Sequence, residues 1–124
     1  MQILYVEDHT DTATVFKLLL EREGHQVTVA RTTREAKEIC IHRVFDLWLL
    51  DLVLPDGHGG DLLKALRKMS DTRAIALTGK GMPHEVAEGK DDGFDDYLVK
   101  PVEFGQLLNA VHQVPSQSDG LIEA

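Results

Sequence analysis

The sequence predicts an α/β fold, a doubly wound parallel sheet of five strands with helices on both faces. Short apolar runs alternate along the chain with longer amphipathic segments, an order typical of parallel sheets with right-handed crossovers. One run, residues 45–51, is apolar almost throughout, as expected of a strand buried on both faces. Polar residues directly follow four of the predicted strands, which makes one edge of the sheet a candidate site.

The first strand is expected at Gln2–Val6, a short apolar run that ends on two acids. His9-Thr10-Asp11 then offers capping side chains for a helix, and Gly24 stands where a glycine commonly ends one. The spacing of the apolar residues predicts that this helix buries one stripe, made of Val15, Leu18 and Leu19 and widened by Phe16 and Leu20.

The second strand is expected at Gln26–Ala30 and the third at Phe45–Asp51. Between them Thr32-Thr33 caps a helix whose core residues are Ala36, Ile39 and Cys40. Trp48 is expected to pack against a helix, and Asp56 to form the turn Pro55-Asp56-Gly57. A third helix follows, with apolar residues at helical spacing: Leu62, Ala65, Leu66 and Met69.

The fourth strand is expected at Ala74–Leu77 and the fifth at Asp96–Val99. Residues 84–92 between them carry a weak helical pattern that contains Gly89. The last helix is clearly amphipathic through Phe104, Leu107, Leu108 and Val111. The flavodoxin-like strand order 2-1-3-4-5 is common among such (βα)5 folds, and its crevice lies between strands one and three. A polar run divides the chain into a domain at 1–114 and a tail or linker at 115–124.

Composition excludes several classes of protein. The 124 residues suffice for one domain, and the net charge of −8 argues against a nucleic-acid surface. Cys40 is the only cysteine, so no intramolecular disulfide can form and a reducing, cytoplasmic compartment is expected. No apolar run is long enough for membrane insertion. The histidines lack metal-ligand spacing and are expected at the surface: His9, His25, His42, His58, His84 and His112.

The strand order brings five polar residues to one edge of the sheet: Glu7, Asp8, Asp51, Thr78 and Lys100. Three clustered carboxylates repel one another unless a cation is present. Oxygen ligands without cysteine or histidine favour Mg²⁺, or another hard divalent cation such as Mn²⁺. Carboxylates can also act as nucleophiles towards phosphorus. We therefore expect a phosphoryl-acceptor site, with the lysine and the threonine hydroxyl holding phosphoryl oxygens.

Five motifs in order resemble the receiver domain of two-component response regulators: Glu7-Asp8, residues 51–57, Thr78-Gly79, residues 93–98 and Lys100-Pro101. The resemblance covers residues 2–114, nearly the whole chain. The runs 75–79 and 81–82 are more similar to receivers of hybrid sensor histidine kinases than to those of transcription factors. The first acid is Glu7 where aspartate is commoner, and its longer side chain favours an indirect metal contact.

The resemblance implies a role for each matching residue. Asp51 would accept the phosphoryl group from a histidine kinase or histidine phosphotransfer domain, and Thr78 and Lys100 would contact it. The implied metal ligands are Glu7, Asp8, Asp51 and the backbone carbonyl of Val53. Thr78 and Tyr97 would act as switch residues that remodel the face of the fourth helix, fifth strand and fifth helix, through which homodimers can form. The implied activity is limited to the domain's own phosphorylation and dephosphorylation, and the Lys100-Pro101 bond is expected to be cis.

Structural explanations exist for each of these residues. Glu7-Asp8 could be an acid pair at a helix N-terminus, where the helix dipole favours it. Asp51 could cap a strand end, and Thr78 could be a turn hydroxyl. Lys100 could be solvated, and the aromatic ring of Tyr97 could belong to the core. Their alignment at one sheet edge favours the functional interpretation.

Three other functions fit the same fold. An aspartyl phosphatase usually has a second carboxylate two residues after its nucleophile, where this chain has Val53. A flavin phosphate would be repelled by the acids, and a domain that is never phosphorylated would not need every reactive position filled. Gly79-Lys80-Gly81 lacks the ending of a phosphate-binding P-loop.

Overall fold

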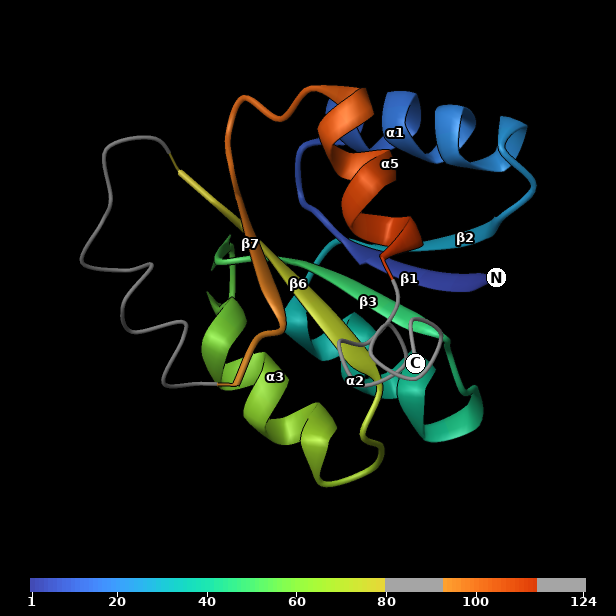
Figure 1. Cartoon of the computed structure of the whole chain (residues 1–124). Coiled ribbons are helices and arrows are strands. Elements are labelled where there is room, and N and C mark those ends of the chain that lie inside the picture. The colour runs from blue at the N-terminus through green and yellow to red at the C-terminus, as the bar shows by residue number, and fades with distance from the viewer. Residues whose placement is uncertain (80–92, 114–124) are drawn as a thin grey trace, which may run out of the picture.

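The computed structural model describes residues 1–79 and 93–113 and confirms the predicted fold (Figure 1). Five parallel strands form the main sheet in the order β2-β1-β3-β6-β7. Their bounds are Gln2–Val6 for β1, Gln26–Ala30 for β2, Leu47–Asp51 for β3, Arg73–Thr78 for β6 and Asp96–Val99 for β7. Because β6 and β7 are the expected fourth and fifth strands, this is the predicted order 2-1-3-4-5.

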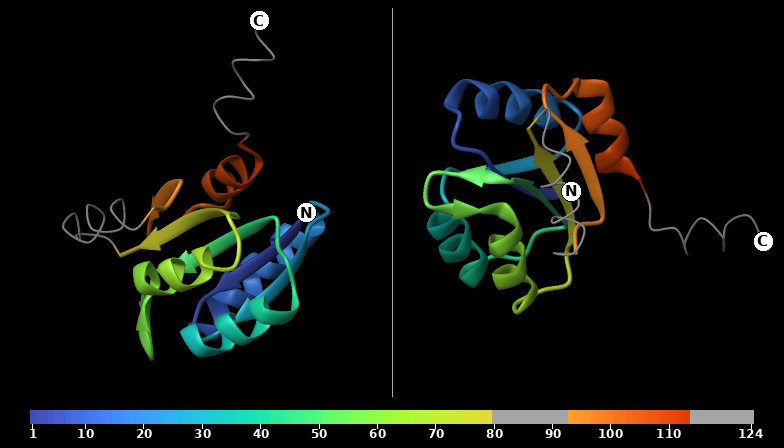
Figure 2. Two further views of the ribbon diagram at one scale, coloured as in Figure 1. Left: turned by 90° about the horizontal axis from the view of Figure 1, so that it is seen from below. Right: turned by 90° about the vertical axis from the view of Figure 1, so that its left-hand side faces the viewer.

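Helices cover both faces of the sheet (Figure 2). The helices within the described residues are α1 (Thr10–Arg22), α2 (Thr33–His42), α3 (Gly59–Arg67) and α5 (Phe104–His112). The helices α1 and α5 pack over one face, and α2 and α3 over the other. Each face has its own apolar cluster, because the central strands are buried on both sides. None of the helices described is long and apolar enough to cross a membrane. The helix expected at 84–92 lies outside the described residues.

A short hairpin after β3 was not predicted as strands. Val53–Leu54 forms β4 and Gly57–His58 forms β5, paired antiparallel around the expected turn at Pro55 and Asp56. The ring nitrogen Nδ1 of His58 accepts a hydrogen bond from the Gly60 N–H at 3.0 Å and caps α3.

The buried face of α1 differs from the predicted stripe. Ala13 and Leu20 are buried and Phe16 packs against them, whereas Val15 and Leu18 are 52% and 58% exposed. The helix carries large apolar residues on more than one side, and the small Ala13 did not stand out as a core residue. The stripe through Val15 and Leu18 is therefore a wrong prediction.

Other predicted helix features are confirmed or shifted by small amounts. Thr32 caps α2 by accepting from the Glu35 N–H at 3.0 Å, and Gly24 ends α1 with φ +95°. The strand expected from Phe45 begins at Leu47, and α3 ends at Arg67, which leaves Met69 45% exposed.

One expected surface histidine is buried. His25 is only 9% exposed, and its Nε2 lies 2.8 Å from Nε2 of His112 in α5. Since that partner comes from 87 positions away, spacing along the chain could not reveal the contact. Trp48 packs as expected in the core beneath α3, with the Arg67 guanidinium 5.5 Å from its ring.

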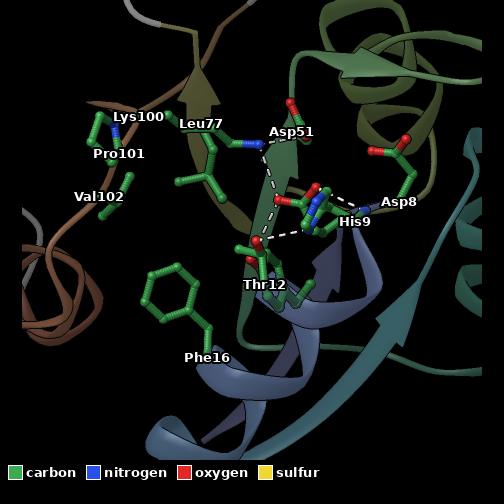
Figure 3. Close-up of a pocket in the computed structure, with 11 residues that line it drawn as sticks. Asp8, His9, Thr12, Phe16, Asp51, Leu77, Lys100, Pro101 and Val102 are labelled. Carbon is green, nitrogen blue, oxygen red and sulfur yellow. Dashed lines mark hydrogen bonds and ion pairs between the residues drawn. The ribbon is translucent and has the colours of Figure 1, made fainter.

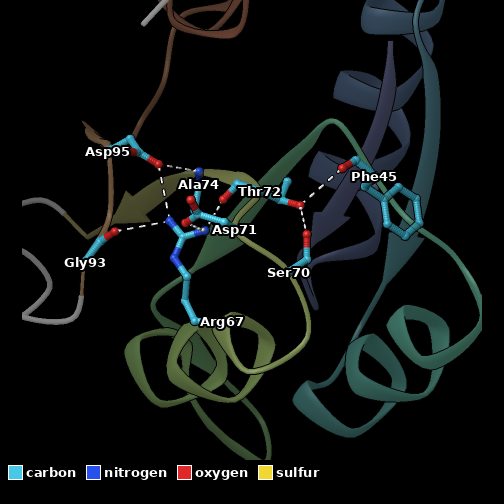
Figure 4. Close-up of polar contacts among 8 residues, drawn as sticks. All are labelled: Phe45, Arg67, Ser70, Asp71, Thr72, Ala74, Gly93 and Asp95. Atoms are coloured by element: carbon cyan, nitrogen blue, oxygen red, sulfur yellow. Dashed lines mark hydrogen bonds and ion pairs between the residues drawn. The ribbon is translucent and has the colours of Figure 1, made fainter.

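Arg67 also ties α3 to the start of two strands (Figure 4). Its guanidinium donates to the carbonyls of Thr72 and Gly93, the latter at 3.3 Å, and lies 3.4 Å from the Asp95 carboxylate. That carboxylate accepts the Ala74 N–H at 2.8 Å. These contacts hold the beginnings of β6 and β7 together at the edge opposite the strand ends that carry the candidate site.

Candidate functional site

The ends of β1 and β3 bring three carboxylates together. The two strands pair in register up to Val6 and Leu50, so the residues that follow lie side by side. One oxygen from each of Glu7, Asp8 and Asp51 lies within 4.8 Å of the others. Glu7 and Asp51 are 1% and 5% exposed, whereas Asp8 faces solvent. The predicted acidic cluster is thus present and open on one side.

Lys100 supplies the counter-charge to the two buried acids. Its Nζ lies 2.8 Å from Asp51 Oδ2 and 3.0 Å from Glu7 Oε1 (Figure 3). The lysine follows β7, its N–H donates to the Thr78 carbonyl at 2.7 Å, and the Lys100-Pro101 bond is cis as expected. Burial acts to lower the pKa of Lys100, but the hydrogen bonds and charges of the two acids outweigh it and raise that pKa.

Glu7 is held from several directions. Its Oε2 accepts the His9 N–H at 3.2 Å, and the Tyr5 hydroxyl lies 3.5 Å from Oε1. Burial raises the pKa of Glu7, and the hydrogen bond from Lys100 only partly opposes that change. Burial also raises the pKa of Tyr5, with the charge of Glu7 adding to it. The direct ion pair explains how a glutamate fits here, because its carboxylate reaches the lysine.

Both oxygens of the Asp51 side chain are already engaged by donors. Oδ2 accepts from Lys100, and Oδ1 accepts the Val53 N–H at 3.1 Å. Gly59 packs so closely that a Cβ there would lie 2.3 Å from the Asp51 carbonyl oxygen. The hairpin after β3 therefore contacts the side chain of this aspartate, and the first residue of α3 lies against its backbone.

Thr78 is fully buried at the end of β6, and its hydroxyl has no hydrogen-bond partner within the described parts of the chain. A buried hydroxyl of this kind can donate to an incoming oxygen ligand. Tyr97 is half-buried against the core, with its ring edge-on to Phe94 at 5.7 Å. Lys80 lies outside the described residues.

A cavity of about 620 Å³ opens beside the carboxylates. Figure 3 shows Phe16 of α1 and Val102, which follows β7, along its apolar side, opposite Asp51 and Asp8. The remaining lining residues are Tyr5, Glu7, His9, Thr12, Leu77, Lys100 and Pro101. Sequence reasoning missed Tyr5, Thr12 and Phe16, since only tertiary packing brings their side chains to the acids.

The donor set fits a hard divalent cation. The candidate ligands are all oxygens, and one of them, on Asp8, is solvent-facing, so a bound ion could keep water ligands as Mg²⁺ commonly does. Three carboxylates against one lysine also leave a negative excess that a cation would offset.

Comparison with known families agrees with the resemblance to receiver domains. A family model described as the response regulator receiver domain matches residues 3–112. The chain belongs to this family. It is a receiver domain of two-component systems, in which response regulators take phosphoryl groups from histidine kinases.

Relatives with known names are longer than this chain. The transcriptional regulatory protein CpxR of Escherichia coli is 36% identical over 117 residues, which make up 94% of this chain and 50% of CpxR. Response regulator ArlR of Staphylococcus epidermidis is 31% identical over 112 residues, 90% of this chain and 51% of ArlR. The chain spans about half the length of these relatives. These relatives do not support the expectation that the chain has no nucleic-acid partner. They also do not support the expected similarity to receivers of hybrid sensor kinases.

Solved structures share the fold closely. A CheY-like receiver domain protein from Methanospirillum hungatei matches with a TM-score of 0.84 and 32% identity, over 89% of each chain. A response regulator from Burkholderia pseudomallei, solved with a phosphorylated aspartic acid, calcium ion and citrate, matches with a TM-score of 0.84 and 28% identity. That match covers 99% of this chain and 72% of the other.

Proposed function

We propose that Asp51 is the phosphoacceptor of this receiver domain and that the donor is a phosphohistidine of a histidine kinase or histidine phosphotransfer domain. The observation that carries the proposal is the position of Asp51, at the end of a buried strand, bonded to Lys100 and open to a cavity. A carboxylate oxygen of Asp51 attacks phosphorus while the bond from phosphorus to the imidazole nitrogen breaks. That nitrogen keeps the electron pair and takes up a proton, so an acyl phosphate and a neutral histidine result.

Glu7, Asp8, Asp51 and the carbonyl of Val53 would hold Mg²⁺, or Mn²⁺ in its place, with Glu7 in indirect contact because its side chain is longer than that of the commoner aspartate. A bound Mg²⁺ supplies positive charge that stabilises the phosphoryl oxygens during transfer. Lys100 is preorganised to contact one phosphoryl oxygen, and the hydroxyl of Thr78, which has no hydrogen-bond partner among the described residues, is a second donor.

The stored phosphoryl group would act as a switch. Thr78 moves towards it, and Tyr97 repacks behind it, which alters the face of β7 and α5. The fourth helix expected in this face lies outside the described residues. That face would select partners, including a second copy of the domain. The domain would also hydrolyse its own acyl phosphate, in a cytoplasmic setting. Val53 has an apolar side chain where an aspartyl phosphatase would need an acid, so turnover of phosphomonoesters is not expected.

The direct test is incubation with acetyl phosphate and Mg²⁺, followed by intact-mass measurement. We expect one added phosphoryl group that requires the metal and is lost in Asp51→Asn. An unmodified wild-type protein, or an adduct that persists in the variant, would refute the assignment.

A further inference from the structure

The hairpin β4–β5 that follows Asp51 is anchored at its tip by Asp56. One carboxylate oxygen accepts the N–H of Thr33 at 2.8 Å, and the other accepts the N–H of Arg34 at 3.1 Å. These are the first two residues of α2, whose free N–H groups and dipole favour a negative charge. The hydrogen bond from Thr33 lowers the pKa of Asp56, with the one from Arg34 adding to it. Asp56 therefore does more than form the expected turn.

The tip also packs closely against the same helix end. A Cβ on Gly57 would lie 3.4 Å from the Thr33 methyl carbon, so the hairpin tip lies against the Thr33 side chain. By contrast, the hairpin itself is held by only two residue pairs, Val53 with His58 and Leu54 with Gly57. A two-stranded ribbon this short has little stability of its own. Its position consequently depends on contacts outside the ribbon, which include the buried side chain of Leu54 at one end and the anchor at α2 at the tip.

The base of the hairpin holds the phosphoacceptor. The Val53 N–H donates to Asp51 Oδ1 at 3.1 Å, opposite the lysine on Oδ2. The carbonyl of the same Val53 is a candidate metal ligand. A shift of the hairpin would thus move a donor away from one carboxylate oxygen and displace the carbonyl beside it.

We propose that Asp56 is a positioning residue for phosphoryl transfer at Asp51, acting from the N-terminus of α2 through the hairpin β4–β5. This inference rests on the proposed function, because it names a residue that serves the same site. The path is continuous: two α2 amides bind Asp56, the hairpin joins Asp56 to Val53, and the Val53 amide orients the acceptor carboxylate.

The test compares Asp56→Ala with Thr32→Ala. Thr32 caps the same helix end through the Glu35 N–H but bonds nothing on the hairpin, so it is a matched control for loss of a cap. Phosphorylation by acetyl phosphate should slow about tenfold or more in Asp56→Ala, because small displacements of reacting groups are costly. It should change less than about twofold in Thr32→Ala, although both variants lose a cap and should lower Tm. Asp56→Asn keeps one strong acceptor, so its phosphorylation rate should lie between those of the wild type and Asp56→Ala.

A second readout needs neither phosphodonor nor metal. Amide hydrogen exchange of Val53 should accelerate in Asp56→Ala and stay at the wild-type rate in Thr32→Ala. Equal phosphorylation rates and equal Val53 exchange in the two alanine variants would overturn the positioning role while leaving Asp51 as acceptor. A wild-type protein that accepts no phosphoryl group would instead remove the proposed function and this inference with it.

Discussion

The Lys100 ammonium lies 2.8 Å from Asp51 Oδ2, across 49 positions of sequence. The lysine follows β7 and the aspartate ends β3, with β6 between them in the sheet. Because the acid is almost fully buried, this ion pair offsets charge that solvent cannot reach. The same cation stands ready to contact an oxygen of a phosphoryl group on Asp51.

Removing that cation should slow phosphorylation. We expect Lys100→Ala to reduce the rate with acetyl phosphate by about 100-fold, the usual cost of losing one preorganised charged donor. Lys100→Arg keeps the charge but changes the donor geometry, and should retain part of the rate. Quenched-flow measurement of the phosphorylated fraction gives both values. A Lys100→Ala variant as fast as wild type would exclude contact between the lysine and the transferred group.

Gly59 should not tolerate a side chain. A Cβ at this position would lie 2.3 Å from the Asp51 carbonyl oxygen and 2.9 Å from Leu52 Cα, so the backbone must shift. We expect Gly59→Ala to lower the free energy of unfolding by about 1–3 kcal/mol. Gly105 in α5 is a matched control, since a Cβ there meets nothing within 4 Å. Gly105→Ala should raise stability by about 0.5–1 kcal/mol, and urea denaturation compares the two.

The two leucines of α1 should differ sharply. Leu20 is fully buried and Leu18 is 58% exposed, although sequence spacing favoured Leu18 as a core residue. Leu20→Ala should cost about 2–5 kcal/mol of unfolding free energy. Leu18→Ala should change it by less than about 0.5 kcal/mol. Similar losses from both substitutions would mean that α1 is rotated relative to the structure.

Stability should fall at mildly acidic pH through His25. Burial lowers the pKa of His25 from the ordinary 6.5, with the Met1 ammonium and His112 adding to the shift and Glu23 opposing it. The unfolded chain therefore binds more protons than the folded one in the window below pH 6.5, so stability is retained above that pH and lost as pH falls towards the folded pKa. Denaturation at several pH values should show a smaller loss in His25→Gln than in wild type. The exposed His42, as His42→Gln, controls for surface effects.

Sequence reasoning succeeded where a signal is local or set by topology. The buried run before Asp51 and the alternation of elements predict the sheet, and the parallel strand order then brings Glu7, Asp8, Asp51, Thr78 and Lys100 to one edge. Each of these residues ends a strand or lies within two positions of its end, so the strand order alone predicts where it lies.

The sequence did not predict contacts between residues that lie far apart along the chain. The pairing of His25 with His112 and the bonds from Asp56 to α2 join residues 87 and 22 or 23 positions apart. Helix rotation was another limit, since α1 has apolar residues around much of its circumference and only packing selects Ala13, Phe16 and Leu20 as the buried side. The division of the chain at residue 114 stays a prediction.

Chemical reduction can show directly whether Asp51 itself stores the phosphoryl group. After reaction with acetyl phosphate and Mg²⁺, borohydride reduction converts an aspartyl phosphate into homoserine, which peptide mass spectrometry locates. We expect homoserine at position 51, dependent on both phosphodonor and metal, and unchanged aspartate at Asp8 and Asp56. Homoserine at another position, or none at all, would contradict it.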